Sequence, residues 1–228
     1  MPIIISGANI SGGVTISDGG IVTSGLLLNL DAGNPSSYSG SGTTWFDLSG
    51  NGNNFTLNGS LTFNNTTGFT GFSQVNRWFR NSFPVNLKTS QGGNGYTTCV
   101  WARCTGTGSW QKLIGNGDEQ NYIDLYAAST SGNYYQEDGS TLYYNDGIEV
   151  ANNGLAMANS VWRMYSSTNL NSGLLTNPTD AFGIGSEGDG QFAYPWIGNI
   201  ATVMIYNRVL STTEMTQNFN AMRGRFGV

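Results

Sequence analysis

The chain is 228 residues long, carries a net charge of −5 and contains no histidine. That length can bury the core of one large domain, and the missing histidine removes Ser-His-Asp and Cys-His catalysis and histidine-ligated zinc. Because no cluster of Lys and Arg can neutralise phosphates and no run approaches about 20 apolar residues, neither nucleic acid nor a membrane is an expected partner.

Turn-forming and aromatic residues dominate the composition. Glycine contributes 33 residues and aromatic side chains 12% of the chain, against only 10% for charged side chains. Glycine supplies the positive φ angles of tight turns, whereas a disordered chain would carry more charge and fewer aromatic residues. The composition therefore indicates a folded, turn-rich protein with a polar but weakly charged surface.

Residues 1–24 differ from the rest of the chain. Val14–Ser17 and Ile21–Thr23 flank Asp18–Gly20, and Asp-Gly supplies the turn of a β-hairpin. Residues 5–13, before Val14, are glycine-rich and have little apolar content. We interpret residues 1–24 as an N-terminal arm or hairpin, with a first strand pair of the main sandwich as the alternative.

A short apolar run opens this arm. It has no basic residue before it and is too short for the apolar region of a signal peptide, so we expect a protein made in the cytoplasm. An unpaired strand can add to the edge of a neighbouring sheet. The predicted attachment residues are Ile3, Ile4 and Ile5.

The next segment combines a buried strand with an oxygen-rich loop. Leu26–Leu30 is an apolar run, and a short strand at 55–57 follows after several Asn-Gly steps. Ca²⁺ takes oxygen ligands from Asp, Asn and backbone carbonyls, and a series of Asx turns is the alternative. The candidate calcium ligands are Asp47, Asn51 and Asn53, with Asp18 and Asp31 as further candidates.

The two cysteines, Cys99 and Cys104, stand five residues apart in an alternating run. In one strand that offset places them on opposite faces, roughly 16 Å apart at about 3.3 Å per residue. A disulfide needs Cα atoms within about 7 Å. The sequence therefore predicts two reduced thiols, and a redox or metal pair is the alternative.

Short apolar segments then recur about every ten residues from 96 to 190, separated by Asn, Gly or Asp. Strands at 8–12-residue intervals with turn signals are typical of a β-sandwich. Tyrosine doublets in two of these segments offer rings on which a sugar can stack, and packing in the core is the alternative. The candidate carbohydrate-binding residues are Tyr134, Tyr135, Tyr143 and Tyr144.

Glycoside hydrolysis is the enzyme class that remains. A retaining glycosidase needs two carboxylates about 5–5.5 Å apart, which alternating positions of one strand provide. The nearest match is Glu187-Gly188-Asp189, but Gln191 stands where a third carboxylate would be, and the glycines beside Asp189 indicate a turn. The Glu137-Asp138-Gly139 sequence also indicates a turn. We expect no catalytic residues and no enzyme activity.

The chain closes with a strand and a helix. An apolar strand at 200–206 leads to Ser211, and Glu214 follows at the spacing of a capping box. Gly224 is the predicted stop, because glycine adopts the left-handed C-cap conformation at low cost. We expect a helix at about 211–222 whose apolar stripe docks it on the rim of the sandwich, with a subunit contact as the alternative. The stripe consists of Met215, Phe219 and Met222.

Both ends of residues 25–228 resemble the LamG-like, concanavalin A-like lectin/glucanase jelly-roll domains of bacteriophage virion proteins. Four motifs and the closing segment carry the resemblance: Leu30-Asp31-Ala32, Asn34–Tyr38, Trp45-x-Asp47-Leu48-Ser49, Gly50–Asn53 and residues 194–227. The middle departs from the pattern. Residues 69–87 stand where relatives carry a Phe-Asp-Gly strand and an Asp-Tyr pair.

The resemblance implies an all-β fold: a jelly-roll β-sandwich of two antiparallel sheets over residues 25–228, with a short C-terminal helix. It implies a phage virion structural protein, as capsid decoration or cement or as a head or tail appendage, located in the virion. The implied partners are the major capsid protein or other virion proteins, further copies of the chain in a trimer, and a cell-surface glycan. A calcium-assisted carbohydrate-binding lectin for host recognition is the alternative, and a glycoside hydrolase is a further one.

Overall fold

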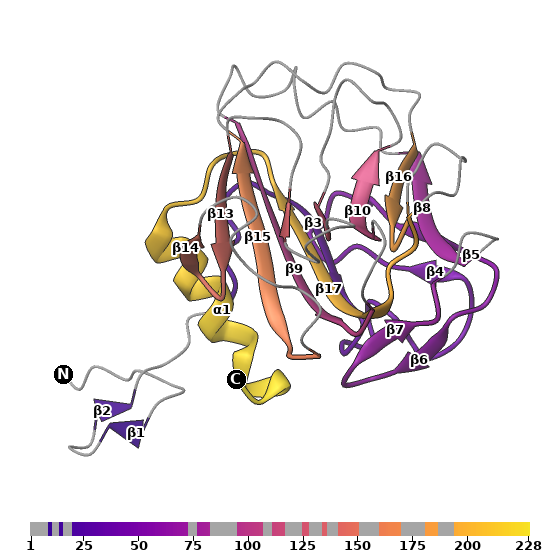
Figure 1. Ribbon diagram of the computed structural model, residues 1–228, viewed down its shortest axis with the longest axis horizontal. Helices are drawn as coiled ribbons and strands as arrows, with labels where there is room; N and C mark the ends of the chain where they lie inside the picture. Colours follow the sequence, from indigo (N-terminus) through magenta and orange to yellow (C-terminus); the bar gives the residue numbers. More distant parts are fainter. Residues whose placement is uncertain are drawn as a thin grey trace.

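The computed structural model describes residues 9–10, 14–15, 20–72, 77–82, 95–106, 111–116, 125–127, 134–135, 141–150, 160–169, 181–186 and 194–228. Two large antiparallel sheets pack face to face, and one helix follows the last strand (Figure 1). The predicted all-β sandwich with a C-terminal helix is confirmed. None of the helices in the described ranges is long and apolar enough to cross a membrane.

One sheet has eight strands and contains the two longest, β9 and β17, at its centre. Its order is β14 (Ile148–Val150), β13 (Thr141–Asn145), β15 (Arg163–Asn169), β9 (Tyr96–Cys104), β17 (Gly198–Tyr206), β7 (Gly68–Thr70) and β6 (Thr62–Asn64), and β3 (Leu26–Asp31) also pairs with β17.

The other large sheet has seven strands. Its order is β12 (Tyr134–Tyr135), β11 (Leu125–Ala127), β10 (Gln111–Asn116), β16 (Ala181–Ile184), β8 (Trp78–Ser82), β5 (Phe55–Asn58) and β4 (Thr44–Trp45). The strands expected at Leu26–Leu30 and 55–57 correspond to β3 and β5. The interleaving of early and late strands in both sheets joins the two ends of the chain.

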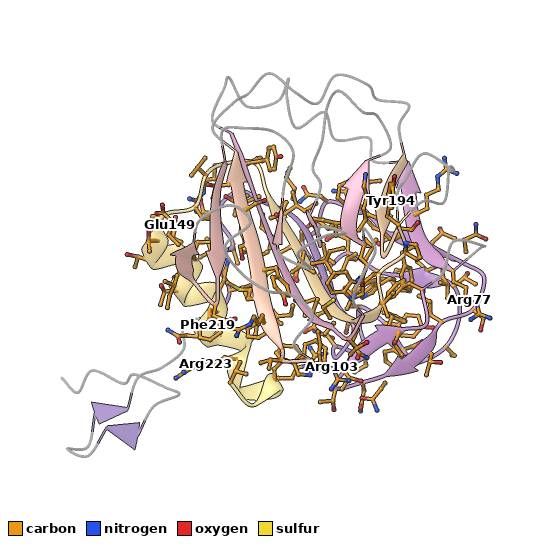
Figure 2. The ribbon with its side chains drawn as sticks, viewed as in Figure 1. Arg77, Arg103, Glu149, Tyr194, Phe219 and Arg223 are labelled. Carbon is orange, nitrogen blue, oxygen red and sulfur yellow. The ribbon has the colours of Figure 1, made fainter. Side chains whose placement is uncertain are left out.

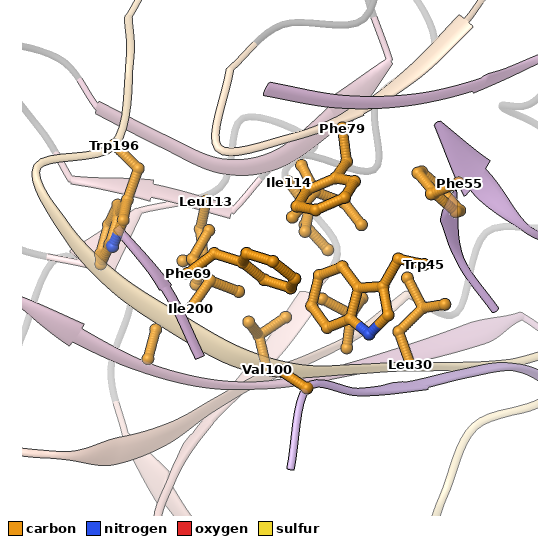
Figure 3. Packing of buried hydrophobic residues seen from close by; sticks show 14 of the residues in the cluster. Leu30, Trp45, Phe55, Phe69, Phe79, Val100, Leu113, Ile114, Trp196 and Ile200 are labelled. Atoms are coloured by element: carbon orange, nitrogen blue, oxygen red, sulfur yellow. The ribbon is translucent and has the colours of Figure 1, made fainter. Parts of the chain in front are cut away.

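The main core lies between the two sheets and is rich in aromatic rings (Figure 3). Phe69 makes edge-to-face contacts with Trp45 and Phe79, with ring centroids 4.8 and 4.6 Å apart. All three side chains are fully buried. Large rings in such contacts bury much apolar surface and also gain from their quadrupoles, so this cluster explains where the aromatic residues of the sequence are used.

A second core lies on the other face of the eight-stranded sheet, beneath helix α1 (Thr212–Phe226). Alternation along β9 sends Val100 into the main core, while Cys99 and Trp101 point to the second. Met215 of α1 is fully buried there, and Phe219 packs against the cluster. The helix therefore docks through its predicted apolar stripe, which covers a sheet face rather than a rim.

The helix boundaries differ from the prediction at one end only. Ser211 and Glu214 form the expected capping box, because each side chain accepts a hydrogen bond from the backbone N–H of the other. The predicted stop at Gly224 is wrong, since the helix continues to Phe226 and Gly227 adopts the left-handed conformation with φ 72°.

The predicted N-terminal hairpin is also wrong in its pairing. β2 (Val14–Thr15) pairs with β1 (Asn9–Ile10) in a separate two-stranded sheet. Residues 21–23 form no strand; Val22 is buried in the second core instead. The apolar residues after the Asp-Gly step therefore pack under α1 rather than forming the second half of a hairpin.

The cysteine prediction is confirmed. Cys99 and Cys104 are both free and buried, and they belong to the two different cores on opposite faces of β9. Burial raises the pKa of both thiols, for Cys99 to about 11. Both sulfurs act as packing atoms in this structure.

Candidate functional site

The loop that carries the predicted calcium ligands is tied together by Asp47. Its Oδ1 accepts hydrogen bonds of 2.9 Å from the backbone N–H groups of Asn29 and Ser49. Its Oδ2 accepts from the Ser49 hydroxyl at 2.7 Å and from the Asn53 backbone N–H at 3.0 Å. Both carboxylate oxygens therefore serve protein donors from β3 and from the loop itself.

The two asparagines of this loop point their amide groups at the same strand. Asn51 Nδ2 donates to the carbonyl oxygens of Leu26 and Leu27 at 3.1 and 3.3 Å, and Asn53 Nδ2 donates to that of Leu27 at 2.8 Å. The structure thus brings Asp47, Asn51 and Asn53 together. The bond from the Ser49 N–H to Asp47 Oδ1 has the spacing of an Asx turn, whereas the two asparagine amides bond to β3. Calcium binding at this loop stays a prediction.

The four predicted sugar-binding tyrosines lie in two different sheets. Tyr134 and Tyr135 form β12, at one edge of the seven-stranded sheet, where they pair with β11. Tyr143 and Tyr144 belong to β13 of the eight-stranded sheet, between β14 and β15. The backbone does not place them on one strand pair, and their role in glycan binding stays a prediction. Ile3, Ile4, Ile5, Asp18, Glu137, Asp138, Glu187, Asp189 and Gln191 lie outside the described residues.

Most carboxylates of the described residues serve structural contacts. Asp31 pairs with Arg225, Asp146 with Arg163 at 2.7 Å and Glu214 with Arg208 at 2.6 Å. Hydrogen bonds from Arg208 and Ser211 hold the pKa of Glu214 well below its usual range, at about 2. Within the ranges that the structure describes, no group of three or more Cys, Asp or Glu could hold a metal ion.

A strip of stacked rings joins α1 to the sheet, and we call Trp101, Trp162, Phe219 and Phe226 the aromatic strip. The Trp101 ring stacks on Phe226 and Phe219 with centroids 4.5 and 5.5 Å apart, and the Trp162 ring lies 4.6 Å from Phe226. Trp101 is fully buried, whereas the other three are partly exposed. The strip therefore reaches from the second core to the surface.

Arginines cover both ends of the aromatic strip. The guanidinium carbon of Arg103 lies 5.7 Å from the Trp162 ring centroid, and that of Arg223 lies 5.8 Å from the Phe219 ring. Cations are attracted to ring faces. Arg103 also donates to Asn199 Oδ1 at 2.9 Å, and among the described residues neither arginine meets a carboxylate. Figure 2 shows Phe219 and Arg223 together on α1.

No pattern in the sequence predicts this strip beyond the spacing of Phe219 in the helix. Trp101 lies in β9 and Trp162 lies just before β15, and only the sheet register brings them together, since Trp101 pairs with Met164, two residues after Trp162. Phe226 lies beyond the predicted helix end. The strip is built by contacts between segments far apart in the sequence, so no local pattern could have predicted it.

No protein-family model and no curated protein sequence matches the chain. Solved structures do share its fold. Trypanosoma rangeli sialidase in complex with sialic acid aligns with 97% of this chain at a TM-score of 0.55 and 12% identity. The binding domain of botulinum neurotoxin DC in complex with SialylT aligns with 88% of it at a TM-score of 0.51 and 10% identity.

The chain spans 36% of the sialidase chain and 52% of the chain of the neurotoxin binding domain. At these identities the likeness establishes a common β-sandwich fold. Sandwich folds host many unrelated activities, so function must be argued from the residues of a site.

Proposed function

We propose that this chain is a non-enzymatic structural module of a bacteriophage virion, acting as a capsid decoration or cement protein or as a head or tail appendage. The observation that supports this most is the role of its motif residues. Asp47 bonds the loop of the predicted calcium ligands to β3, and Ser211 with Glu214 starts the C-terminal helix. The motifs that resemble phage LamG-like domains thus hold the fold at both ends.

The chemistry of the described residues agrees with a passive role. Three of their carboxylates are engaged by arginines, and Asp47 is saturated by protein donors. A glycosidase acid needs a raised pKa and a free second carboxylate beside it. The lowered pKa of Glu214 is the opposite of that requirement.

Particles purified on a density gradient from the host of origin test the proposal. We expect mass spectrometry to find the chain in the particle band at a stoichiometry of many copies, and electron microscopy to place a β-sandwich on the outer surface. Finding the chain only in the particle-free fractions would contradict a virion role.

The predicted attachment role of the N-terminal arm is tested by a deletion that leaves the β-sandwich intact. Because Val22 is buried in the second core, removal of residues 1–19 is preferable to removal of residues 1–24. We expect the shortened chain to fold but to lose its place on particles. Full occupancy without residues 1–19 would exclude Ile3, Ile4 and Ile5 from attachment.

A second candidate function is glycan binding, which favours a host-recognition role on the same particle. Its support is the shared fold with a sialidase solved with sialic acid and with a toxin binding domain solved with SialylT. A glycan array on the purified chain, with and without Ca²⁺, tests it. Selective glycan binding supports this function if it is lost in the double variant Tyr134→Ala/Tyr135→Ala or in Tyr143→Ala/Tyr144→Ala. Binding to no glycan on the array contradicts it.

A further inference from the structure

An exposed carboxylate lies beside α1 on the outer face of the eight-stranded sheet. The backbone of Glu149 pairs with Tyr144, and that row of the sheet continues through Ser166 to Cys99. Residues aligned across a sheet share a face, and Cys99 points into the core under α1. Glu149 therefore faces the helix side. It is exposed and makes no ion pair or hydrogen bond within the part of the chain that is described.

The position of Glu149 along the helix follows from the turn before β14. A Cβ added to Gly147 would lie 3.0 Å from the Cα atom of Thr216, so this turn touches the first half of α1. Thr216 is exposed there. The negative charge is thus located beside the first half of the helix.

A cation that meets no carboxylate among the described residues lies on the same side of α1, further along. Arg223 follows Thr216 by seven residues, which is two helical turns or about 10 Å. Phe219 lies between these two positions, partly exposed, with the guanidinium of Arg223 over its ring. Figure 2 shows Glu149, Phe219 and Arg223 along the edge of the molecule that carries α1.

Glu149 of β14 and Arg223 of α1 carry opposite charges at separate points along the side of the helix, and this makes the surface self-complementary. A two-fold axis across it places two copies of α1 antiparallel, so that Glu149 meets Arg223 of the partner subunit and Arg223 meets the partner's Glu149. Such an isologous contact uses each patch twice. A wholly acidic partner would be repelled by Glu149, and a wholly basic one by Arg223.

We propose that a second copy of this chain docks on the exposed side of α1 through reciprocal Glu149–Arg223 ion pairs across the partly exposed Phe219 ring. The contact is weak and depends on salt, because exposed ion pairs contribute little and are screened. It is independent of the virion and glycan proposals.

Sedimentation equilibrium of the full chain at low and at high salt tests this contact. We expect dimers at low salt, and at least a ten-fold weaker association constant in Glu149→Lys and in Arg223→Glu, about 1.4 kcal/mol. The double variant Glu149→Lys/Arg223→Glu exchanges the charges and restores the dimer. Arg77→Glu is the control, because Arg77 is exposed on the far side of the molecule in Figure 2 and its reversal leaves association unchanged.

Three results would overturn the proposal. The first is a monomer at all accessible concentrations in low salt. The second is a dimer that both single reversals leave intact. The third is a double variant that stays as dissociated as the single ones, since reciprocal pairing requires rescue. Circular dichroism of each variant separates loss of association from loss of folding.

Discussion

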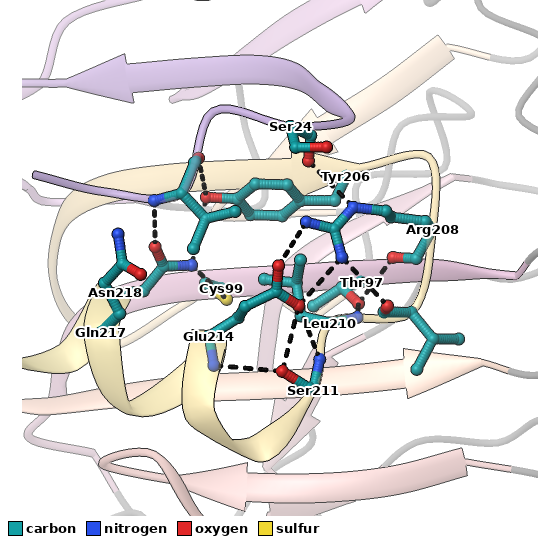
Figure 4. Close-up of polar contacts among 12 residues, drawn as sticks. Ser24, Thr97, Cys99, Tyr206, Arg208, Leu210, Ser211, Glu214, Gln217 and Asn218 are labelled. Carbon is teal, nitrogen blue, oxygen red and sulfur yellow. Dashed lines mark hydrogen bonds and ion pairs between the residues drawn. The ribbon is translucent and has the colours of Figure 1, made fainter.

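The Oδ1 atom of Asn218 accepts a 2.8 Å hydrogen bond from the backbone N–H of Val22, which lies 196 residues earlier in the chain. Asn218 Nδ2 donates to the Tyr206 hydroxyl at 3.1 Å, and that hydroxyl donates to the Val22 carbonyl at 2.9 Å (Figure 4). Burial raises the pKa of the Tyr206 hydroxyl. This closed triangle fixes the N-terminal segment beneath the C-terminal helix.

Replacing Asn218 tests the contribution of the triangle to stability. Asn218→Ala leaves the buried N–H of Val22 and the hydroxyl of Tyr206 each without one partner, so we expect a loss of about 2–3 kcal/mol in the free energy of unfolding. Urea denaturation followed by tryptophan fluorescence measures it. Asn220→Ala is the control, since Asn220 is half-buried in the same helix and makes no hydrogen bond in the described structure. Equal losses of unfolding free energy in both variants would show that the hydrogen bonds of the triangle add no stability of their own.

The Glu214–Arg208 contact predicts a dependence of stability on pH. The folded-state pKa of Glu214 lies at about 2, below its ordinary value of 4.5, chiefly because Arg208 donates hydrogen bonds to it. A lowered pKa stabilises the fold fully above about pH 4.5, and this contribution is lost as the pH falls towards 2. We expect Glu214→Gln to cost about 1 kcal/mol at pH 6 and almost nothing near pH 2.

Urea denaturation of Glu214→Gln and the unaltered protein at several pH values measures this difference. Glu149→Gln is the control, because Glu149 is exposed and has no ion pair among the described residues. Dilute protein keeps association out of the comparison. A difference between Glu214→Gln and the unaltered protein that does not change with pH would contradict the ionic origin.

Local signals in the sequence predicted the start of the helix but not its end. Ser211 and Glu214 satisfy each other within one turn, so their spacing alone decides the N-terminus. The end depends on Phe226, whose ring stacks on Trp101 and lies near Trp162. Burial of that ring outweighs the cost of about 1 kcal/mol for keeping Gly224 inside the helix. Such a contact with distant strands leaves no local signal.

The same limit explains the hairpin and the aromatic strip. Val14 and Thr15 have strand-forming side chains that suit pairing on either side, and the choice between Asn9–Ile10 and residues 21–23 was settled by the second core, which takes up Val22. The alternation around Cys99 was predictable because one strand defines both faces. Sheet order and helix docking were not, since they depend on contacts between segments far apart in the sequence.

Gly68 predicts a strong effect from one methyl group. Its φ is +68°, and a Cβ there would overlap the carbonyl oxygen of Ile200 on the neighbouring strand β17. We expect Gly68→Ala to destabilise the protein by about 3 kcal/mol or more, from backbone strain and overlap together. Gly52→Ala is the matched control, because φ is +75° but no atom lies within 4 Å of the added Cβ. The difference in melting temperature between the two variants isolates the effect of the overlap. Similar melting temperatures would contradict the prediction.

The buried thiols predict slow chemical labelling of the folded protein. Cys99 is fully buried with a thiol pKa of about 11, so at pH 8 only about one molecule in a thousand carries its reactive thiolate. Cys104 is also fully buried. We expect Ellman's reagent to label neither cysteine in the native state and both in guanidinium chloride.

Because access to Cys99 requires opening of the second core, Asn218→Ala should speed labelling of Cys99 more than that of Cys104, which belongs to the other core. Rapid labelling of either thiol in the native protein would mean that the sheets pack less tightly around β9 than the structure shows.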